Sequence, residues 1–176
     1  MQYKVLESNG VEIENIDGGA FNNFTAGGES GIVVGVLDEC SLLAQGTSVI
    51  MNTGLLLVKG IRIKVVSPIT FYVVGNPASD AIYHIVAKVE LSSNNTIGVT
   101  ISSKQRSTLT KQDLYKTNSG IYELEIATFT HYANGSVGGV ERTCKILNNK
   151  LSNIKTEEWT FTLEDGSTVT KKVVVM

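Results

Sequence analysis

The sequence predicts an all-β fold, either a compact β-sandwich or a partly open barrel, with a hairpin at each end and at most one short helix. Short apolar runs rich in Val, Ile and Leu follow one another between Gly27 and Val66, and each ends at a glycine or a polar pair. Elsewhere apolar and polar residues alternate, as expected of strands with one buried face. Glycine is abundant, with 17 residues against two prolines, so glycine supplies most of the turns.

The start of the chain predicts an N-terminal hairpin over residues 3–16. Asn9 and Gly10 separate two strand-like runs, and both tolerate the positive φ of a type I′ turn. The two-residue loop sets these pairs in opposition: Leu6 with Ile13, Tyr3 with Ile16, and Glu7 with Glu12. Directly opposed like charges are unfavourable. This leaves three explanations, namely a different register, incomplete pairing, or a cation between the carboxylates, and we expect a different register.

The middle of the chain is expected to hold the core. Leu55–Val58 is a continuous apolar run, typical of a strand buried on both faces, and we place it at the centre of the core. In Ile61–Val65, apolar residues alternate with Arg62 and Lys64, which predicts a strand whose charged face meets water.

Longer strands are predicted in the second half. Their patterns indicate strands over Ile69–Val74, Ala81–Leu91, Ile97–Ser102, Ile121–Thr130 and Val137–Ile146. The alternation breaks near Ala127, as at a β-bulge. One helix of one or two turns is expected within residues 107–117, because Thr110 and Asp113 have the spacing of a capping box.

The end of the chain predicts a C-terminal hairpin. A three-residue loop, Glu164–Gly166, with its glycine in the left-handed conformation, is a common hairpin connection. The loop sets these pairs opposite each other: Thr162 with Thr168, Phe161 with Val169, Thr160 with Thr170, and Glu158 with Lys172. The pairs match in character across the ladder. Because a lone two-stranded hairpin is marginal in water, Trp159, Phe161 and Val169 are expected to pack on the main part of the chain or on another copy.

These elements suggest three parts. They are an N-terminal hairpin arm over residues 1–26, a main β domain over 27–147, and a linker with the C-terminal hairpin over 148–176. The polar run FNNFTAGGES after the first hairpin is typical of a loop or extended arm, with Phe21 and Phe24 as anchors. The predicted oligomer or docking contacts are therefore Trp159, Phe161, Val169, Phe21 and Phe24.

Composition excludes several classes of protein. The net charge is −2, with no basic excess, so we expect no nucleic-acid partner. No apolar run reaches the length of a membrane span and the first residues lack the apolar segment of a signal peptide, so we expect synthesis in a cytoplasm and no membrane contact. Only 18% of the residues are charged, which suggests that other subunits cover part of the surface.

Few residues predict catalysis. The sequence lacks a G-x-S-x-G nucleophile elbow, a G-x-G-x-x-G dinucleotide motif and a P-loop. His84 and His131 are the only histidines, and we expect both to be hydrogen-bonded structural residues. Cys40 and Cys144 lack the paired spacing of a zinc site and are expected to be free thiols, although one disulfide is an alternative. The sequence thus predicts no catalytic residue, no metal site and no cofactor.

A sugar-binding surface is the alternative hypothesis. Tyr115, Tyr122, Tyr132 and Trp159 are aromatic residues that can stack on sugar rings if they share one surface. Aromatic residues on strands more often pack in a core or an interface, so we give this hypothesis second place.

The sequence also resembles a known family. The run FNNFTAGGESGIVVGVLDECSLLAQGTSVIMNTGLLLVKGIRIKVV is similar to a domain of tail-tip and baseplate structural proteins of phages and prophages of Gram-positive bacteria. The resemblance continues through YHIVAKVEL, TLTKQDLYKTNSGIYELEIATFTH and YANGSVGGVERT, and so covers about Phe21 to Thr143. The closing WTFTLEDGSTVTKKVVV looks like a C-terminal segment of several such proteins.

The resemblance implies a structural component of a phage or prophage tail or baseplate that is not an enzyme. It implies a homo-oligomer, a trimer or a hexamer, that contacts other tail or baseplate proteins, is made in the cytoplasm of the bacterial host and resides in the virion tail. The chain lacks the collagen-like extension and separate receptor-binding head of many tail fibres, which favours a connector over direct host binding. The alternative is a carbohydrate-binding module that adheres to a host surface glycan.

Overall fold

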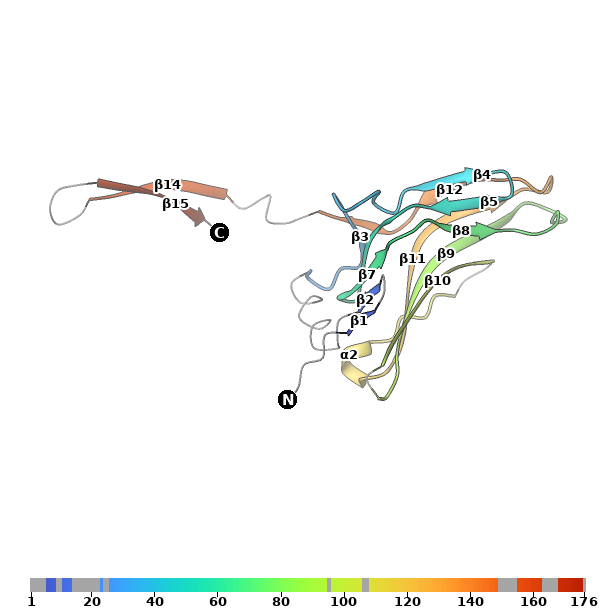
Figure 1. Cartoon of the computed structure of the whole chain (residues 1–176), viewed down its shortest axis with the longest axis horizontal. Coiled ribbons are helices and arrows are strands. Elements are labelled where there is room, and N and C mark those ends of the chain that lie inside the picture. The colour runs from blue at the N-terminus through green and yellow to red at the C-terminus, as the bar shows by residue number, and fades with distance from the viewer. Residues whose placement is uncertain are drawn as a thin grey trace.

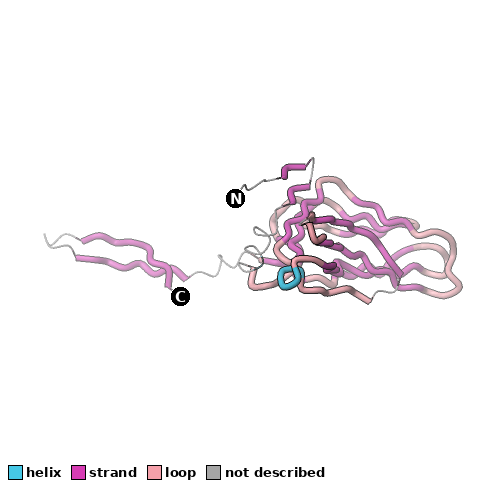
Figure 2. Tube along the Cα trace, turned by 90° about the horizontal axis from the view of Figure 1, so that it is seen from below, coloured by secondary structure: helices cyan, strands magenta, loops and turns pink. Residues whose placement is uncertain are grey.

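The computed structural model describes residues 6–8, 11–13, 23, 26–94, 96–105, 108–148, 155–162 and 168–175. Strands dominate this part of the chain, as the sequence predicts (Figure 1). Figure 2 shows how little of the described chain is helical. The strands form a sandwich and not a closed barrel, so the predicted all-β class is confirmed.

Three sheets make up the body, a name used here for the elements from β3 to β13. The first sheet has the order β10 (Ile97–Gln105), β9 (Ala81–Leu91), β11 (Gly120–His131), β12 (Val137–Arg142). The second has the order β13 (Lys145–Leu147), β3 (Gly31–Val33), β6 (Gly54–Val58), β7 (Ile61–Val65). The third has the order β4 (Leu42–Gln45), β5 (Ser48–Met51), β8 (Ile69–Tyr72). All strand pairs are antiparallel except β13–β3, which is parallel.

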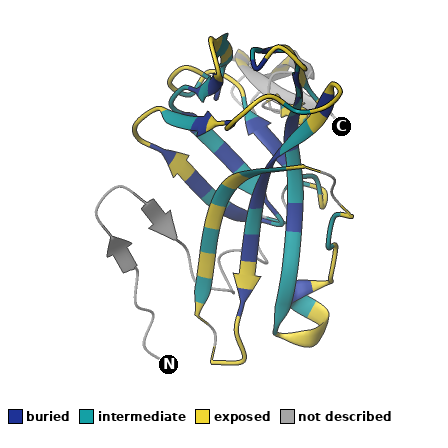
Figure 3. Cartoon of the chain, turned by 90° about the vertical axis from the view of Figure 1, so that its right-hand side faces the viewer, coloured by how far each residue is buried: buried dark blue, intermediate teal, exposed yellow. Residues whose placement is uncertain are grey.

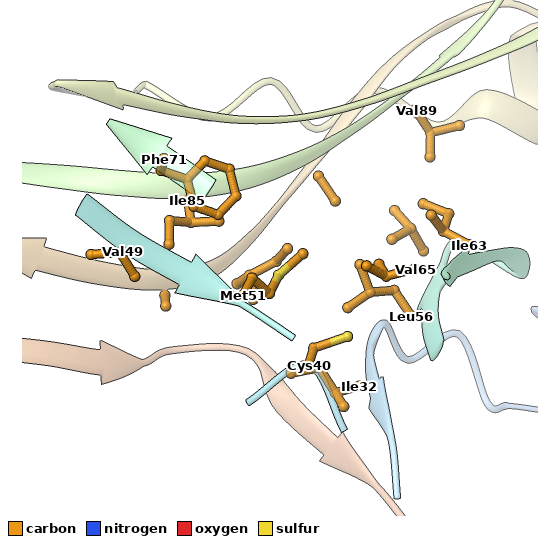
Figure 4. Close-up of a cluster of buried hydrophobic side chains, with 14 of the residues drawn as sticks. Ile32, Cys40, Val49, Met51, Leu56, Ile63, Val65, Phe71, Ile85 and Val89 are labelled. Carbon is orange, nitrogen blue, oxygen red and sulfur yellow. The ribbon is translucent and has the colours of Figure 1, made fainter. Parts of the chain in front are cut away.

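The core lies where the long strands of the first sheet face the two shorter sheets. All three sheets contribute completely buried side chains, among them Met51, Leu56 and Ile85 (Figure 4). On β9 the odd-numbered residues from Ile85 to Leu91 enter this core, whereas His84 and Lys88 lie on the opposite face and are only half-buried. One face of β9 is therefore buried, as the alternation predicts, but Val86 on the face of His84 is buried as well.

The run Leu55–Val58, expected at the centre of the core, lies in β6. The run Ile61–Val65, expected to turn a charged face to water, forms β7 and pairs with β6. Leu56 and Val58 are fully buried, and Leu55 and Leu57 are half-buried, so β6 is covered on both faces. On β7, Lys64 is exposed while its apolar neighbours are buried. The expected burial of β6 on both faces is confirmed, whereas the charged face of β7 meets water at Lys64 and is half-buried at Arg62.

Two irregularities shape the first sheet. The register between β11 and β9 shifts between Glu125 and Ala127, so the predicted bulge is confirmed. The predicted strand Val137–Ile146 is wrong as a single element, because the chain leaves β12 at Arg142 and continues as β13 beside β3 in the second sheet.

The helix with described bounds, α2 (Leu114–Thr117), begins three residues later than the capping box predicts. Asp113 is its N-cap, and its carboxylate accepts from Tyr115 N and Lys116 N, both at 3.3 Å. Thr110 instead belongs to an extended segment that pairs with β11, and its carbonyl accepts from Glu123 N at 2.7 Å. Among the described residues no helix has the length and apolar character needed to cross a membrane.

The N-terminal hairpin consists of β1 (Leu6–Ser8) and β2 (Val11–Ile13). Leu6 faces Ile13 and Glu7 faces Glu12, so the register set by the short loop is present and the expectation of a different register is wrong. Local turn geometry fixes the register of a short hairpin more strongly than one like-charge pair opposes it. β2 lies against β7, which places this hairpin beside the second sheet.

Two glycines permit close approaches inside the body. A Cβ atom at Gly31 would lie 2.1 Å from the carbonyl oxygen of Lys145, across the β3–β13 pair. A Cβ atom at Gly54 would lie 2.4 Å from the backbone nitrogen of Cys40. Because both obstacles are backbone atoms, neither can turn aside as a flexible side chain would.

We predict that Gly31→Ala lowers the free energy of unfolding by about 1–3 kcal/mol, because the added methyl group forces β13 away from β3. Urea unfolding followed by circular dichroism measures the change. Gly98→Ala is the matched control, since the nearest atom to its added Cβ, Glu90 O, lies 3.8 Å away. Equal stability of the two variants would contradict the close approach.

Candidate interaction surface

The C-terminal hairpin is formed by β14 (Lys155–Thr162) and β15 (Thr168–Val175). Its register pairs Phe161 with Val169, Thr160 with Thr170 and Glu158 with Lys172, so the predicted register is confirmed. Residues that face each other across a ladder share a face of the sheet. Phe161 and Val169 therefore lie on one face, and Trp159, two residues before Phe161, lies on the same face.

This hairpin packs chiefly on itself. β14 and β15 contact each other along their length, and neither has a substantial contact with another described element. Figure 1 shows the hairpin set apart from the sheets of the body. Glu158, Thr160, Thr168 and Thr170, all on the face opposite Trp159, are exposed. The structure thus places three of the five predicted contact residues together, while the other two, Phe21 and Phe24, lie outside the described residues.

β10 provides a second open edge. It is the outermost strand of the first sheet, with nine residues, and no described strand pairs with its far side. Exposed and half-buried residues alternate along it (Figure 3). Its single charged residue, Lys104, is occupied by an ion pair with Glu123 at 2.6 Å. Free charges commonly protect edge strands from pairing, and this edge lacks one.

Ion pairs cover the outer face of the first sheet. Glu123, which is 8% exposed, accepts from Lys104 Nζ at 2.6 Å and from Thr110 N at 2.9 Å. Beside it, His84 Nδ1 lies 2.5 Å from Glu125 Oε2, with both side chains 22% exposed. His84 and Glu125 are 41 positions apart in sequence and Lys104 and Glu123 are 19 apart, and neither pair was predicted from the sequence. The sequence does contain one sign of these pairs. His84 and Lys88 share a face of their strand, and another predicted strand has acids at alternate positions.

The environment of Glu123 stabilises its ionised form. Burial favours the neutral acid, but the hydrogen bonds from Lys104 and Thr110, together with the positive charges of Lys104 and Lys88, outweigh burial. The pKa of Glu123 is therefore below its usual value. The carboxylate is held as a charged structural partner, and proton donation is not favoured.

A cleft of about 590 Å³ borders this network. It lies between the turn at 27–30, the extended segment at 109–111, β11 and the start of β13. Glu123, Glu125 and Glu29 line it, and each already has a side-chain partner: Lys104, His84 and, at 3.0 Å, Lys145. A ligand that used these acids would have to displace their partners.

The cysteines are free, as expected. Burial raises the pKa of the Cys40 thiol to about 11, and the nearby Cys144 acts in the same direction. Burial also raises the pKa of Cys144. Neither thiol is activated as a nucleophile. Within the described ranges, no group of three His, Cys, Asp or Glu residues is arranged to hold a metal ion.

His131 differs from the expected hydrogen-bonded histidine. It is 2% exposed, and within the described part of the chain neither ring nitrogen has a hydrogen-bond partner. Its ring packs edge-on against Tyr83, with 5.9 Å between the ring centroids. The prediction of a satisfied histidine is therefore correct for His84, which is paired with Glu125, and wrong for His131.

The tyrosines proposed as a sugar-stacking surface serve internal contacts instead. The Tyr115 hydroxyl donates to the carbonyl of Lys59, and burial raises the pKa of Tyr115 to about 12. Tyr122 lies beneath the Lys59 ammonium, 5.1 Å from the ring centroid. Tyr132 is half-buried against Gly138. These rings do not form one open aromatic platform.

No protein-family model matches the chain, and no curated protein matches its sequence.

We predict that Glu123→Gln lowers the free energy of unfolding at neutral pH by about 1–2 kcal/mol, because two charge-assisted hydrogen bonds are weakened. The folded-state pKa is depressed, so this contribution is present above the unfolded-state pKa and is lost as pH falls through the folded-state value. The difference between wild type and variant should therefore shrink below about pH 4.

Urea titrations over a pH series give this measurement. Glu90→Gln is the control, because Glu90 also pairs with a lysine, at 2.8 Å, but its side chain is 51% exposed. A Glu123→Gln effect that stayed constant into the acid range would show that the ionised form is not the stabilising one.

We predict that His131→Leu raises the free energy of unfolding by about 1 kcal/mol, because it removes two buried ring nitrogens without partners. Thermal unfolding at neutral pH provides the measurement. His84→Leu, which removes the same ring where it is paired with Glu125, should instead lower stability. A loss of stability in His131→Leu would mean that its ring nitrogens have a partner.

Proposed function

We propose that this chain is a structural component of a phage or prophage tail or baseplate, acting through contacts with copies of itself and with neighbouring subunits. The observation that carries the proposal is the C-terminal hairpin. It has one face with Trp159, Phe161 and Val169, it has two open edges, and it packs on no other described element. A two-stranded hairpin of this kind is stable only when something covers it.

The resemblance in the sequence supplies the class of assembly. The segment GLLLVKGIRIKVV, which carries much of it, forms β6 and β7, and its apolar residues are used for the core. Apolar residues that pack in the core in this way are consistent with a structural subunit. The open edge of β10 gives neighbouring tail proteins a second place to attach by strand addition.

The chemistry of the polar residues supports a role without catalysis. The acids beside the cleft are paired with lysine or histidine side chains, and the thiols have raised pKa values. The carbohydrate-binding alternative has less support, since Tyr115 and Tyr122 are engaged within the body. The proposed protein is made in the host cytoplasm, forms a trimer or a hexamer, and serves as a connector in the virion tail.

The test is to locate the chain in particles. We expect mass spectrometry of purified phage particles, or of particles induced from a prophage, to detect the chain in a fixed ratio to the other tail proteins. Immunogold electron microscopy should label the end of the tail. An abundant cytoplasmic protein of the same lysate controls for contamination. Presence of the chain in the lysate but not in the particles would refute the proposal.

A further inference from the structure

The C-terminal hairpin has two unlike faces. By its register, Trp159, Phe161, Val169, Val173 and Val175 share one face, together with Lys155, Glu157 and Lys171. The other face carries mostly threonine, and its Thr160 and Thr170 hydroxyl oxygens lie 3.0 Å apart and are exposed. Five of the eight positions on the first face are apolar, whereas Thr160 and Thr170 on the other face are exposed, so the first face, called the apolar face below, is the one that favours a partner.

The edges of the hairpin need partners as well. β14 and β15 have eight residues each, contain no proline, and pair only with each other among the described strands. Each therefore presents a row of unpaired backbone groups. Docking on one edge of the body would pair one of these rows and leave the other open. Pairing with hairpins of other copies satisfies both rows.

The charges favour one kind of edge pairing. β14 contains Lys155, Glu157 and Glu158, a net charge of −1. β15 contains Lys171 and Lys172 and no acid, a net charge of +2. A contact between two β15 edges would bring four lysines together, and a contact between two β14 edges would bring four glutamates and two lysines together, a net charge of −2. Only β14 beside β15 of the next copy joins strands of opposite charge.

We propose that the C-terminal hairpins of several copies join edge to edge, with β14 of one copy antiparallel to β15 of the next, in a closed ring whose apolar face points inward. Copies related by rotation about an axis along the strands present alternating strand directions, so each new pair is antiparallel like the pair within one hairpin. A head-to-tail contact of this kind closes when the rotation closes. Closure removes both open edges and covers Trp159, Phe161 and Val169 together.

This inference rests on the proposed function, which requires several copies of the chain to associate. It adds which strands form the contact between the copies. The test uses the full chain and compares Phe161→Glu with Thr160→Glu. The two variants add the same charge at neighbouring positions of β14, one on each face. Light scattering coupled to gel filtration gives the mass, against 18.9 kDa for one chain. Amide hydrogen exchange of β14 and β15 reports whether the backbone groups along their outer edges are hydrogen-bonded. Exchange of β9 reports whether the body remains folded.

We expect wild type and Thr160→Glu to be oligomers whose β14 and β15 amides exchange slowly throughout. Phe161→Glu should be a single chain in which these amides exchange fast while β9 stays protected. An unchanged oligomer in Phe161→Glu would overturn the inference and leave the proposed function standing, because copies would then meet elsewhere. Fast exchange of alternate amides in the wild-type oligomer would overturn edge pairing. A wild-type single chain at micromolar concentration would overturn the ring, and the presence of the chain in particles would separately decide its function.

Discussion

Each strand carries two rows of backbone donors and acceptors, and a strand at the edge of a sheet leaves one row without a partner. Within the body, some backbone groups at strand edges have hydrogen-bond partners in other segments of the same chain. Val137 N donates to the carbonyl of Gly46, and along β11 Glu123 N donates to the carbonyl of Thr110. No described strand supplies such partners along β10 or along the outer sides of β14 and β15. The parts of the molecule that invite contact with other chains are therefore the parts where backbone pairing is incomplete.

The first sheet separates two kinds of stabilisation by face. Its inner face supplies fully buried side chains such as Ile85 and Val89, whose burial is worth about 1.5–3 kcal/mol each. Its outer face carries the ion pair of Glu123 with Lys104 and the hydrogen-bonded pair of His84 with Glu125. Ion pairs of this exposure contribute less than the core does. The outer face is therefore polar, whereas the buried apolar residues of the inner face hold the sheets together.

How much the sequence predicts depends on the distance over which residues act. The register of the C-terminal hairpin was predicted correctly, because a short loop fixes which positions oppose each other. The same argument gives the observed register of the N-terminal hairpin, but the pair Glu7–Glu12 led us to expect a different one. The buried face of β9 and the bulge near Ala127 follow from alternation within one strand. The helix start was wrong, because the backbone groups near Thr110 pair with β11, a contact outside any local pattern. The parallel β3–β13 pair and the packing of His131 on Tyr83 depend on residues far apart in the chain, so local patterns do not show them. For the Glu123 network, alternation shows which residues share a face but not which strands are neighbours.

The parallel pair β3–β13 also affects how the body would resist a pulling force. Gly31 lies opposite Lys145 and Val33 opposite Leu147, and Val34 N donates to the carbonyl of Leu147. The chain enters β3 at one end of this pair and leaves β13 at the other, on its way to the C-terminal hairpin. A pull between the start of β3 and the end of β13 acts along the strands in opposite directions. Such a pull would load the backbone hydrogen bonds of the pair together, so the whole pair would resist a force applied through the C-terminal hairpin.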